Sequence, residues 1–312
     1  MKIKISLLLA IASVLIYSNS FSQEKKTLSK EDYKKWEQLS STVISPDGKW
    51  VSYSISLNEG NDTLFIVNPE TDSVIKEAFA SGLRFSPDSR WAAYRIGVSY
   101  KKQEEMQEKK QTLHYKMGLL DMVSGKKVVY KEISSFAFPE EGDHLVMKTY
   151  KPKESKAEGS DIVVMNLANM EMRTIGNVTE YSFNKKGDFL AYVTEPANDI
   201  GKGVEVFDLR DYSIKILASD TSSFSNLLWE KEGESLAFLH QLKNKDYKED
   251  NHEVIAFRNV YKGFNKESFS PVTYPDFPEK MRINKSRLQW SEDQSAVFFG
   301  LKDWNMTEKA LK

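Results

Sequence analysis

Short apolar stretches alternate with polar turns along most of this chain, and the alternation repeats itself. Residues 44–53 read ISPDGKWVSY and residues 85–94 read FSPDSRWAAY, so that Ser86 follows Ser45 by 41 residues. Within each copy, apolar and polar residues alternate as they do in a strand with one buried face. A repeated unit of about 40 to 50 residues is typical of one blade of a β-propeller.

Six copies of this turn can be placed along the sequence. Its residue types suit a tight turn, because Pro fixes φ, Asp bonds its own backbone and Gly allows a positive φ. The aromatic or apolar residue before the turn is, in chain order, Ile44, Phe85, Phe138, Phe183, Trp229 and Trp290. We therefore predict an all-β fold, a β-propeller of four-stranded blades with about five complete blades and a partial sixth. A β-sandwich also uses short strands, but it does not predict the same turn at this spacing.

The sequence before the first unit divides into a leader and a helix. A basic start, the apolar run ISLLLAIASVLIY and small residues after it predict a signal peptide over residues 1–22, with an uncleaved anchor as the alternative. We therefore expect an exported protein, periplasmic or extracellular, with no stable membrane span after cleavage. Residues 23–41 are predicted as a helix and lead-in, and residues 42–312 as the incomplete propeller domain.

The predicted helix covers residues 29–38 and is amphipathic. Ser29 and Asp32 have the spacing of a capping box, and Leu28 with Tyr33 that of a hydrophobic staple. Helical periodicity would place Tyr33, Trp36 and Leu39 on one face. We expect this face to pack on the segment that follows.

Three charged stretches interrupt the repeat, at residues 100–112, 151–160 and 241–252. Each joins the second and third strands of its unit, so all three should emerge on one face of the disc. The first of them is interpreted as a short helix or a mobile loop, and all three as solvated surface segments. The alternative is a rim that contacts a second domain or a partner.

Composition and charge limit the classes of partner and chemistry. The hydrophobic content of 40% and charged content of 29% are those of a globular protein. A net charge of −1 gives no bulk attraction to nucleic acid, and no nucleic-acid partner is expected. The chain has no cysteine, which excludes disulfides, a cysteine nucleophile and thiolate metal sites.

The sequence offers no convincing site for chemistry. It contains no G-x-S-x-G elbow, no G-x-G-x-x-G, no phosphate-binding loop and no EF-hand spacing. The histidines, the adjacent acids and the repeating tryptophans are all interpreted as structural or solvated: His114, His144, His240, His252, Glu104–Glu105, Glu140–Glu141, Trp50, Trp91, Trp229 and Trp290. We therefore assign no catalytic, cofactor-binding or metal-binding residue and expect no cofactor.

Taken together, several segments resemble the N-terminal propeller of secreted serine peptidases of the prolyl oligopeptidase family, in particular those of the Bacteroidetes type. The segments are LSKEDYKKWEQLSSTVISPDGKWVSYSI, LRFSPDSRWAAYRI, YSFNKKGDFLAYVT and LAFLHQ. The turn alone is shared with TolB-like propellers, whereas the combination of leader, helix, blade order and charged insertion in the second blade is more specific. The resemblance covers residues 23–312.

This resemblance implies a non-catalytic role. In the family, the propeller caps an α/β-hydrolase domain with a Ser-Asp-His triad and admits peptides while it excludes folded proteins. The triad and oxyanion hole have no matching positions in this chain, and neither acidic pair copies the Glu-Glu motif of dipeptidyl-peptidase relatives. We therefore expect a fragment, split gene product or truncated form whose partners are an α/β-hydrolase domain and peptide substrates.

Two other interpretations stay open at this point. The chain could be a stand-alone TolB-like periplasmic propeller that binds a protein or ligand, or an enzyme with an unrecognised site, which the absence of a nucleophile and base disfavours. In each case an open ring leaves strand edges and apolar faces exposed at its ends, and we expect marginal stability or self-association.

Overall fold

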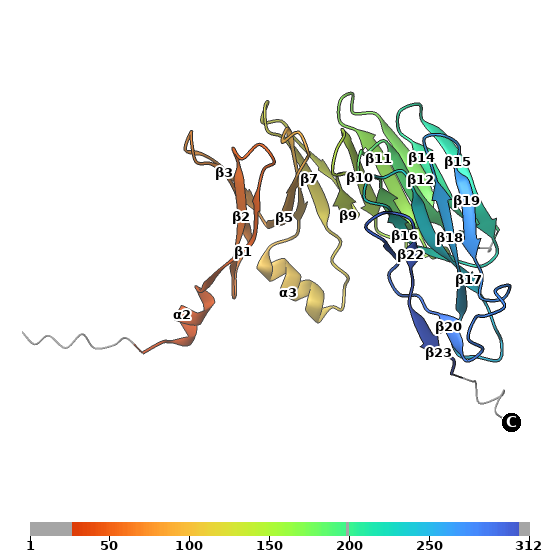
Figure 1. Ribbon diagram of the computed structural model, residues 1–312. Coiled ribbons are helices and arrows are strands. Elements are labelled where there is room, and N and C mark those ends of the chain that lie inside the picture. The colour runs from red at the N-terminus through yellow and green to blue at the C-terminus, as the bar shows by residue number, and fades with distance from the viewer. Residues whose placement is uncertain (1–26, 198–199, 306–312) are drawn as a thin grey trace, which may run out of the picture.

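The computed structural model describes residues 27–197 and 200–305, and their fold is all-β and propeller-like. Antiparallel sheets stand side by side in an arc from the N-terminus to the C-terminus (Figure 1). The predicted signal peptide at residues 1–22 lies outside the described residues. The propeller of four-stranded blades predicted from the repeat is confirmed.

Each blade is a meander of antiparallel strands in chain order. Blade 1 contains β1 (Glu37–Ile44), β2 (Val51–Leu57), β3 (Thr63–Asn68) and β4 (Ser73–Ala78). Blade 2 contains β5 (Ala80–Phe85), β6 (Trp91–Ile96), β7 (Lys116–Asp121) and β8 (Lys127–Tyr130). Blade 5 contains β16 (Phe224–Trp229), β17 (Leu236–Leu242), β18 (Asn251–Arg258) and β19 (Asn265–Phe269).

Blades 3 and 4 share one continuous strand. Blade 3 has β9 (Ile133–Ala137), β10 (His144–Thr149) and β11 (Ser160–Asn166), and blade 4 has β13 (Phe189–Thr194), β14 (Lys202–Asp208) and β15 (Ser213–Asp220). Between them, β12 (Met172–Phe183) pairs with β11 in its first half and with β13 in its second half. It is therefore the last strand of blade 3 and the first of blade 4, and the two blades form one seven-stranded sheet.

The sixth unit contributes two interrupted strands in the described residues. β20 (Met281–Ile283) pairs with β23 (Leu301–Asp303), and β21 (Gln289–Trp290) pairs with β22 (Val297–Phe298). They follow the order of the first and second strands of a blade, as the prediction of a partial sixth blade requires.

The repeated turn is a hydrogen-bonding device. In blade 1 the Ser45 hydroxyl donates to Asp47 at 2.6 Å and accepts from the Trp50 backbone N–H at 2.9 Å. Ser86 and Ser291 do the same in their turns. The residue that closes the turn has a positive φ even where it is not glycine, as in Ser89 (60°). These side chains therefore stabilise the turns.

The hydrophobic core lies between blades and is divided into five clusters. Each cluster combines the facing sides of two consecutive blades, from blades 1 and 2 to blade 5 and the sixth unit. Trp91 and Trp229 lie within such clusters, and Trp50 and Trp290 pack against others. The four tryptophans therefore lie between blades, as expected.

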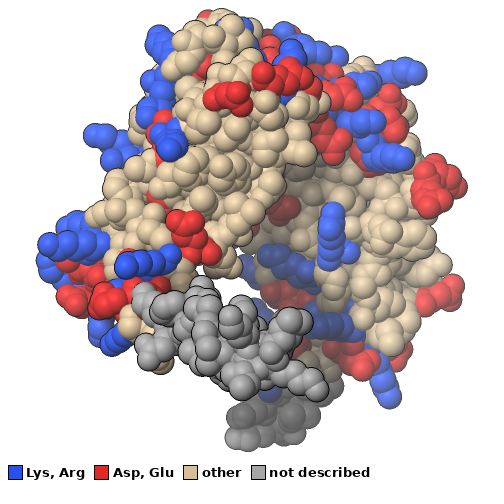
Figure 2. Space-filling model, turned by 90° about the vertical axis from the view of Figure 1, so that its left-hand side faces the viewer, with Lys and Arg blue, Asp and Glu red and all other residues tan. Residues whose placement is uncertain are grey.

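One face of blade 1 has no covering sheet in the described part of the chain. Strand pairing places Ile44, Val51, Tyr53, Phe65 and Val74 on this face, opposite the side that packs on blade 2. Ile44 is 63% exposed and Val74 50%. Figure 2, viewed from the blade 1 end, shows a broad surface without charged side chains above the grey atoms.

The N-terminal helix differs from its prediction. α2 spans only Lys30–Lys34, although the capping box between Ser29 and Asp32 is present. Residues from Glu37 onward pair with β2, so Leu39 belongs to a strand, because sheet hydrogen bonds override the helical periodicity. Tyr33 and Trp36 stack on each other at 4.2 Å but remain 56% and 43% exposed, so the expected packing is wrong.

The first of the three insertions is helical. α3 spans Tyr100–Glu108, has no buried residue, and begins at the Ser99 hydroxyl, which accepts from the Lys102 backbone N–H. Neither α2 nor α3 has the length and hydropathy of a membrane-crossing helix.

Packing between blades sets the stability. Leu145 is fully buried between blades 2 and 3, and its replacement by Ala should lower the free energy of unfolding by about 2 to 5 kcal/mol through lost burial and the cavity left behind. Urea unfolding at 25 °C measures this change. The control Val123→Ala alters a side chain that is 82% exposed and should change it by less than about 0.5 kcal/mol. Equal midpoints for both variants would contradict the assignment of the core.

Candidate functional site

The first strands of the blades line a groove along the inner side of the arc. Its largest part is a pocket of about 930 Å³ between β9, β12, β16 and the sixth unit. Two smaller hollows of about 470 and 460 Å³ continue it toward blades 1 and 2 and toward Trp290. They share the residues of β9 and β16 with the central pocket, so we call the three together the axial groove.

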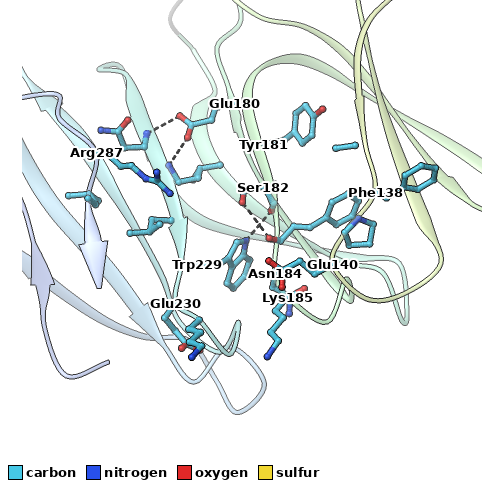
Figure 3. Close-up of a pocket in the computed structure, with 18 residues that line it drawn as sticks. Phe138, Glu140, Glu180, Tyr181, Ser182, Asn184, Lys185, Trp229, Glu230 and Arg287 are labelled. Carbon is cyan, nitrogen blue, oxygen red and sulfur yellow. Dashed lines mark hydrogen bonds between the residues drawn. The ribbon is translucent and has the colours of Figure 1, made fainter. Parts of the chain in front are cut away.

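The groove has apolar walls and charged ends. Phe138, Tyr181 and Phe183 contribute partly exposed rings, and the turns after the first strands place Glu140, Lys185 and Lys231 at one end. Figure 3 shows Lys185 and Glu230 near this end and Arg287 on the opposite wall from Phe138. An open passage with rings and charges of both signs suits binding of an extended polar chain.

Glu180 lines the groove, but its carboxylate is hydrogen-bonded to backbone N–H groups of the next blade. Its carboxylate accepts hydrogen bonds from the backbone N–H groups of Asn226 at 2.8 Å and Leu227 at 2.7 Å (Figure 3). These residues form a bulge in β16, where Asn226 has a φ of 60° and the register with β17 shifts. The bulge frees two N–H groups from the ladder, and the carboxylate of the preceding blade satisfies them.

The tryptophans at the ends of β16 and β21 connect neighbouring first strands. The indole N–H of Trp229 donates to the Ser182 carbonyl at 3.0 Å, and that of Trp290 to the Leu228 carbonyl at 3.2 Å. The same contact is therefore repeated one blade further along, and both rings brace the wall of the groove.

The histidines are dispersed over the fold. His114 stacks on Tyr150 and contacts Glu132, and His240 stacks on Phe224. His144 is buried, and burial lowers its pKa below the usual value. None of these three lines the axial groove. The fourth, His252, lines a separate pocket described below.

The two acidic pairs also lie apart. Glu104 and Glu105 are on α3, where Glu105 pairs with Lys102. Glu140 and Glu141 lie in the turn of blade 3 and are exposed, with only Glu140 at the groove. Across residues 27–197 and 200–305, no three His, Cys, Asp or Glu side chains are grouped so as to hold a metal ion.

No family model and no curated protein matches the sequence. Among solved structures, the β-propeller domain of the Trilobed protease from Pyrococcus furiosus is 16% identical with a TM-score of 0.45, over 86% of this chain and 80% of that chain. Acylaminoacyl peptidase from Pyrococcus horikoshii is 14% identical with a TM-score of 0.43, over 88% of this chain and 44% of its own. TolB from Acinetobacter baumannii is 12% identical with a TM-score of 0.33, over 75% and 55%.

These similarities do not assign the chain to a protein family. The chain spans less than half the length of the acylaminoacyl peptidase. At such low identities and TM-scores, no activity is transferred from any of these proteins to this chain.

The Glu180 contact can be tested directly. Replacing Glu180 by Ala leaves the N–H groups of Asn226 and Leu227 without their acceptor and should lower the free energy of unfolding by about 2 kcal/mol. Thermal or urea unfolding measures the loss. Glu140→Ala removes an exposed carboxylate from the same pocket and should cost less than about 0.5 kcal/mol. If both variants lose the same stability, Glu180 does not support the bulge.

Proposed function

We propose that this chain is the non-catalytic, substrate-gating propeller of an exported serine peptidase of the prolyl oligopeptidase family. The observation that carries the proposal is the axial groove. It is a groove formed by the inner strands of successive blades, and its width is set by rigid sheets. Such a groove accommodates an extended peptide but is too narrow for a folded protein.

The chemistry of the groove supports gating over catalysis. Two of its acids, Glu180 and Glu230, are already hydrogen-bonded to two backbone N–H groups each, and the four histidines lie outside it. Exposed peptide backbone needs hydrogen-bonding groups and peptide side chains need apolar contacts, and the groove supplies both. Bond cleavage is therefore assigned to a separate α/β-hydrolase domain that carries the nucleophile.

The charged insertions supply a surface for that domain. α3 and the link between β17 and β18 both join a second strand to a third strand, so they emerge on the same side of the blades. Figure 1 shows α3 and the ends of β20 and β23 on this side. We propose that the hydrolase domain contacts this side and that the predicted leader at residues 1–22 directs export.

Isolation of this protein from its native cell tests whether a catalytic serine peptidase domain accompanies it. A tag placed at the chromosomal gene should recover, from the exported fraction, a polypeptide that reacts with a fluorophosphonate, which labels activated serines. The 312-residue chain expressed alone should remain unlabelled, because it lacks a nucleophile elbow. Recovery of the native protein as an unlabelled chain no longer than these 312 residues, or from a fraction other than the exported one, would refute the proposal.

The uncovered face of blade 1 should drive self-association of the isolated chain. Exposed apolar sheet faces bind other apolar surfaces. We expect concentration-dependent dimers or larger species in sedimentation velocity, and the double variant Ile44→Lys/Val74→Lys should shift them to monomer, since both side chains are exposed and lie on this face.

The matched control is Val123→Lys, which adds one charge at an apolar residue that is 82% exposed and lies in a turn of blade 2. It should leave the association unchanged. A wild-type chain that is monomeric at all concentrations would show that this face does not drive self-association.

A further inference from the structure

A second pocket, separate from the axial groove, lies where blades 4 and 5 meet the sixth unit. Its volume is about 580 Å³, and we call it the polar pocket. Its lining includes Arg282 of β20 and Lys302 of β23, two strands that Figure 1 shows on the same side of the blades as α3. The residues that line it are Glu195, Ser223, Ser225, Gln241, Glu249, Asp250, His252, Arg282, Asn284, Lys285, Ser286 and Lys302.

Charged and polar side chains are buried in the wall of this pocket. Arg282, Asn284 and Glu195 are each only 8% exposed. Charged side chains are rarely buried to this degree unless they are paired, because removing a charge from water costs several kcal/mol. Their positions therefore require partners.

The described residues leave these groups incompletely paired. The Nε of Arg282 and the Oδ1 of Asn284 have no hydrogen-bond partner in the described part of the chain. The Glu195 carboxylate makes no hydrogen bond or ion pair with a described residue. The polar contacts of Arg282 are long, at 3.4 Å from Nη1 to the Asp250 carbonyl and 3.9 Å from Nη2 to Glu249, and its guanidinium lies 5.9 Å from the centre of the Trp304 ring. Buried groups without partners are exceptional in native proteins.

Hydrogen bonds between neighbouring strands hold the backbone around these groups in place. His252 Nδ1 lies 2.9 Å from the Ile283 carbonyl oxygen, and the Asn251 side chain accepts from the Ile283 backbone N–H at 2.8 Å. These two contacts connect β18 to β20. Gly300 also has a defined role, because a Cβ there would lie 2.6 Å from the Asn284 Oδ1. The unpaired amide oxygen therefore depends on a glycine opposite it.

The charges that face the pocket balance. Arg282, Lys285 and Lys302 oppose Glu195, Glu249 and Asp250. Burial lowers the pKa of His252, which favours the neutral form of this ring. A simple anion or cation would leave one sign of charge unmatched, whereas a zwitterion matches both.

The acids differ in how far they are already engaged. Asp250 accepts from the Gln241 amide, and Glu249 accepts from the Asn305 amide at 2.7 Å. Glu249 Oε2 also has no hydrogen-bond partner among the described residues, but Glu195 is the carboxylate with neither oxygen engaged, and we assign it to a ligand ammonium group. Arg282 offers its guanidinium group for a carboxylate, with Lys285 and Lys302 exposed beside it.

We propose that the polar pocket binds a small zwitterion, a free amino acid or dipeptide, with its ammonium group on Glu195 and its carboxylate on Arg282. Asn284 accepts a further N–H of the ligand. This site does not depend on the peptidase assignment, since it lies within the chain itself and would operate equally in a stand-alone binding propeller.

Calorimetric titration of the full chain with glycylglycine at pH 7 tests the proposal. We expect saturable binding, and Glu195→Gln should weaken it by about tenfold or more, because it removes a charge-assisted contact while keeping the size of the side chain. Acetate and ethylamine, which each carry one half of the charge pair, should bind more weakly than glycylglycine.

Two further variants test whether the ligand binds in the polar pocket. Glu140→Gln makes the same change in the axial groove and should leave the affinity unaltered, while Gly300→Ala should reduce it by crowding Asn284. Thermal unfolding shows that each variant is folded before it is titrated. No binding by the folded wild type, equal effects of Glu195→Gln and Glu140→Gln, or acetate binding as tightly as glycylglycine would each overturn the proposal.

Discussion

A four-stranded sheet with two apolar faces cannot be buried by its own chain segment, and the whole structure depends on this constraint. Blades 2 to 5 each contribute residues to two clusters, one on either side, and the five clusters alternate with the blades along the arc. The blades are therefore stable only as neighbours. The same constraint turns all first strands toward one side, so it creates the axial groove as a consequence of packing.

Much of this architecture could be predicted from sequence because its determinants are local. Ser45, Asp47 and Gly48 lie within four residues and make their own turn, and strand alternation is visible in any short window. The helix prediction failed near Leu39 because a pairing with β2 decided the conformation there. The continuity of β12 through two blades could not be predicted from the sequence either, since pairing with β11 and with β13 determines it.

The candidate sites could not be found from sequence, and the reason is distance along the chain. Glu180 meets Asn226 across 46 residues, and the polar pocket gathers Glu195 with residues more than one blade away. A single acid among uncharged residues of a first strand, as in VTEYSF, was the one visible sign of Glu180. For the polar pocket no pattern in the sequence distinguished Arg282 or Asn284 from surface residues of the same type.

The shared strand β12 also determines how the fold comes apart. Blades 3 and 4 are connected by a continuous ladder of backbone hydrogen bonds as well as by side-chain packing. Neither can detach without breaking β12, so these two blades form one cooperative unit at the centre of the molecule. Blade 1 has a single packed side among the described residues, and its amide protons should therefore exchange with solvent through local openings that leave the seven-stranded sheet intact.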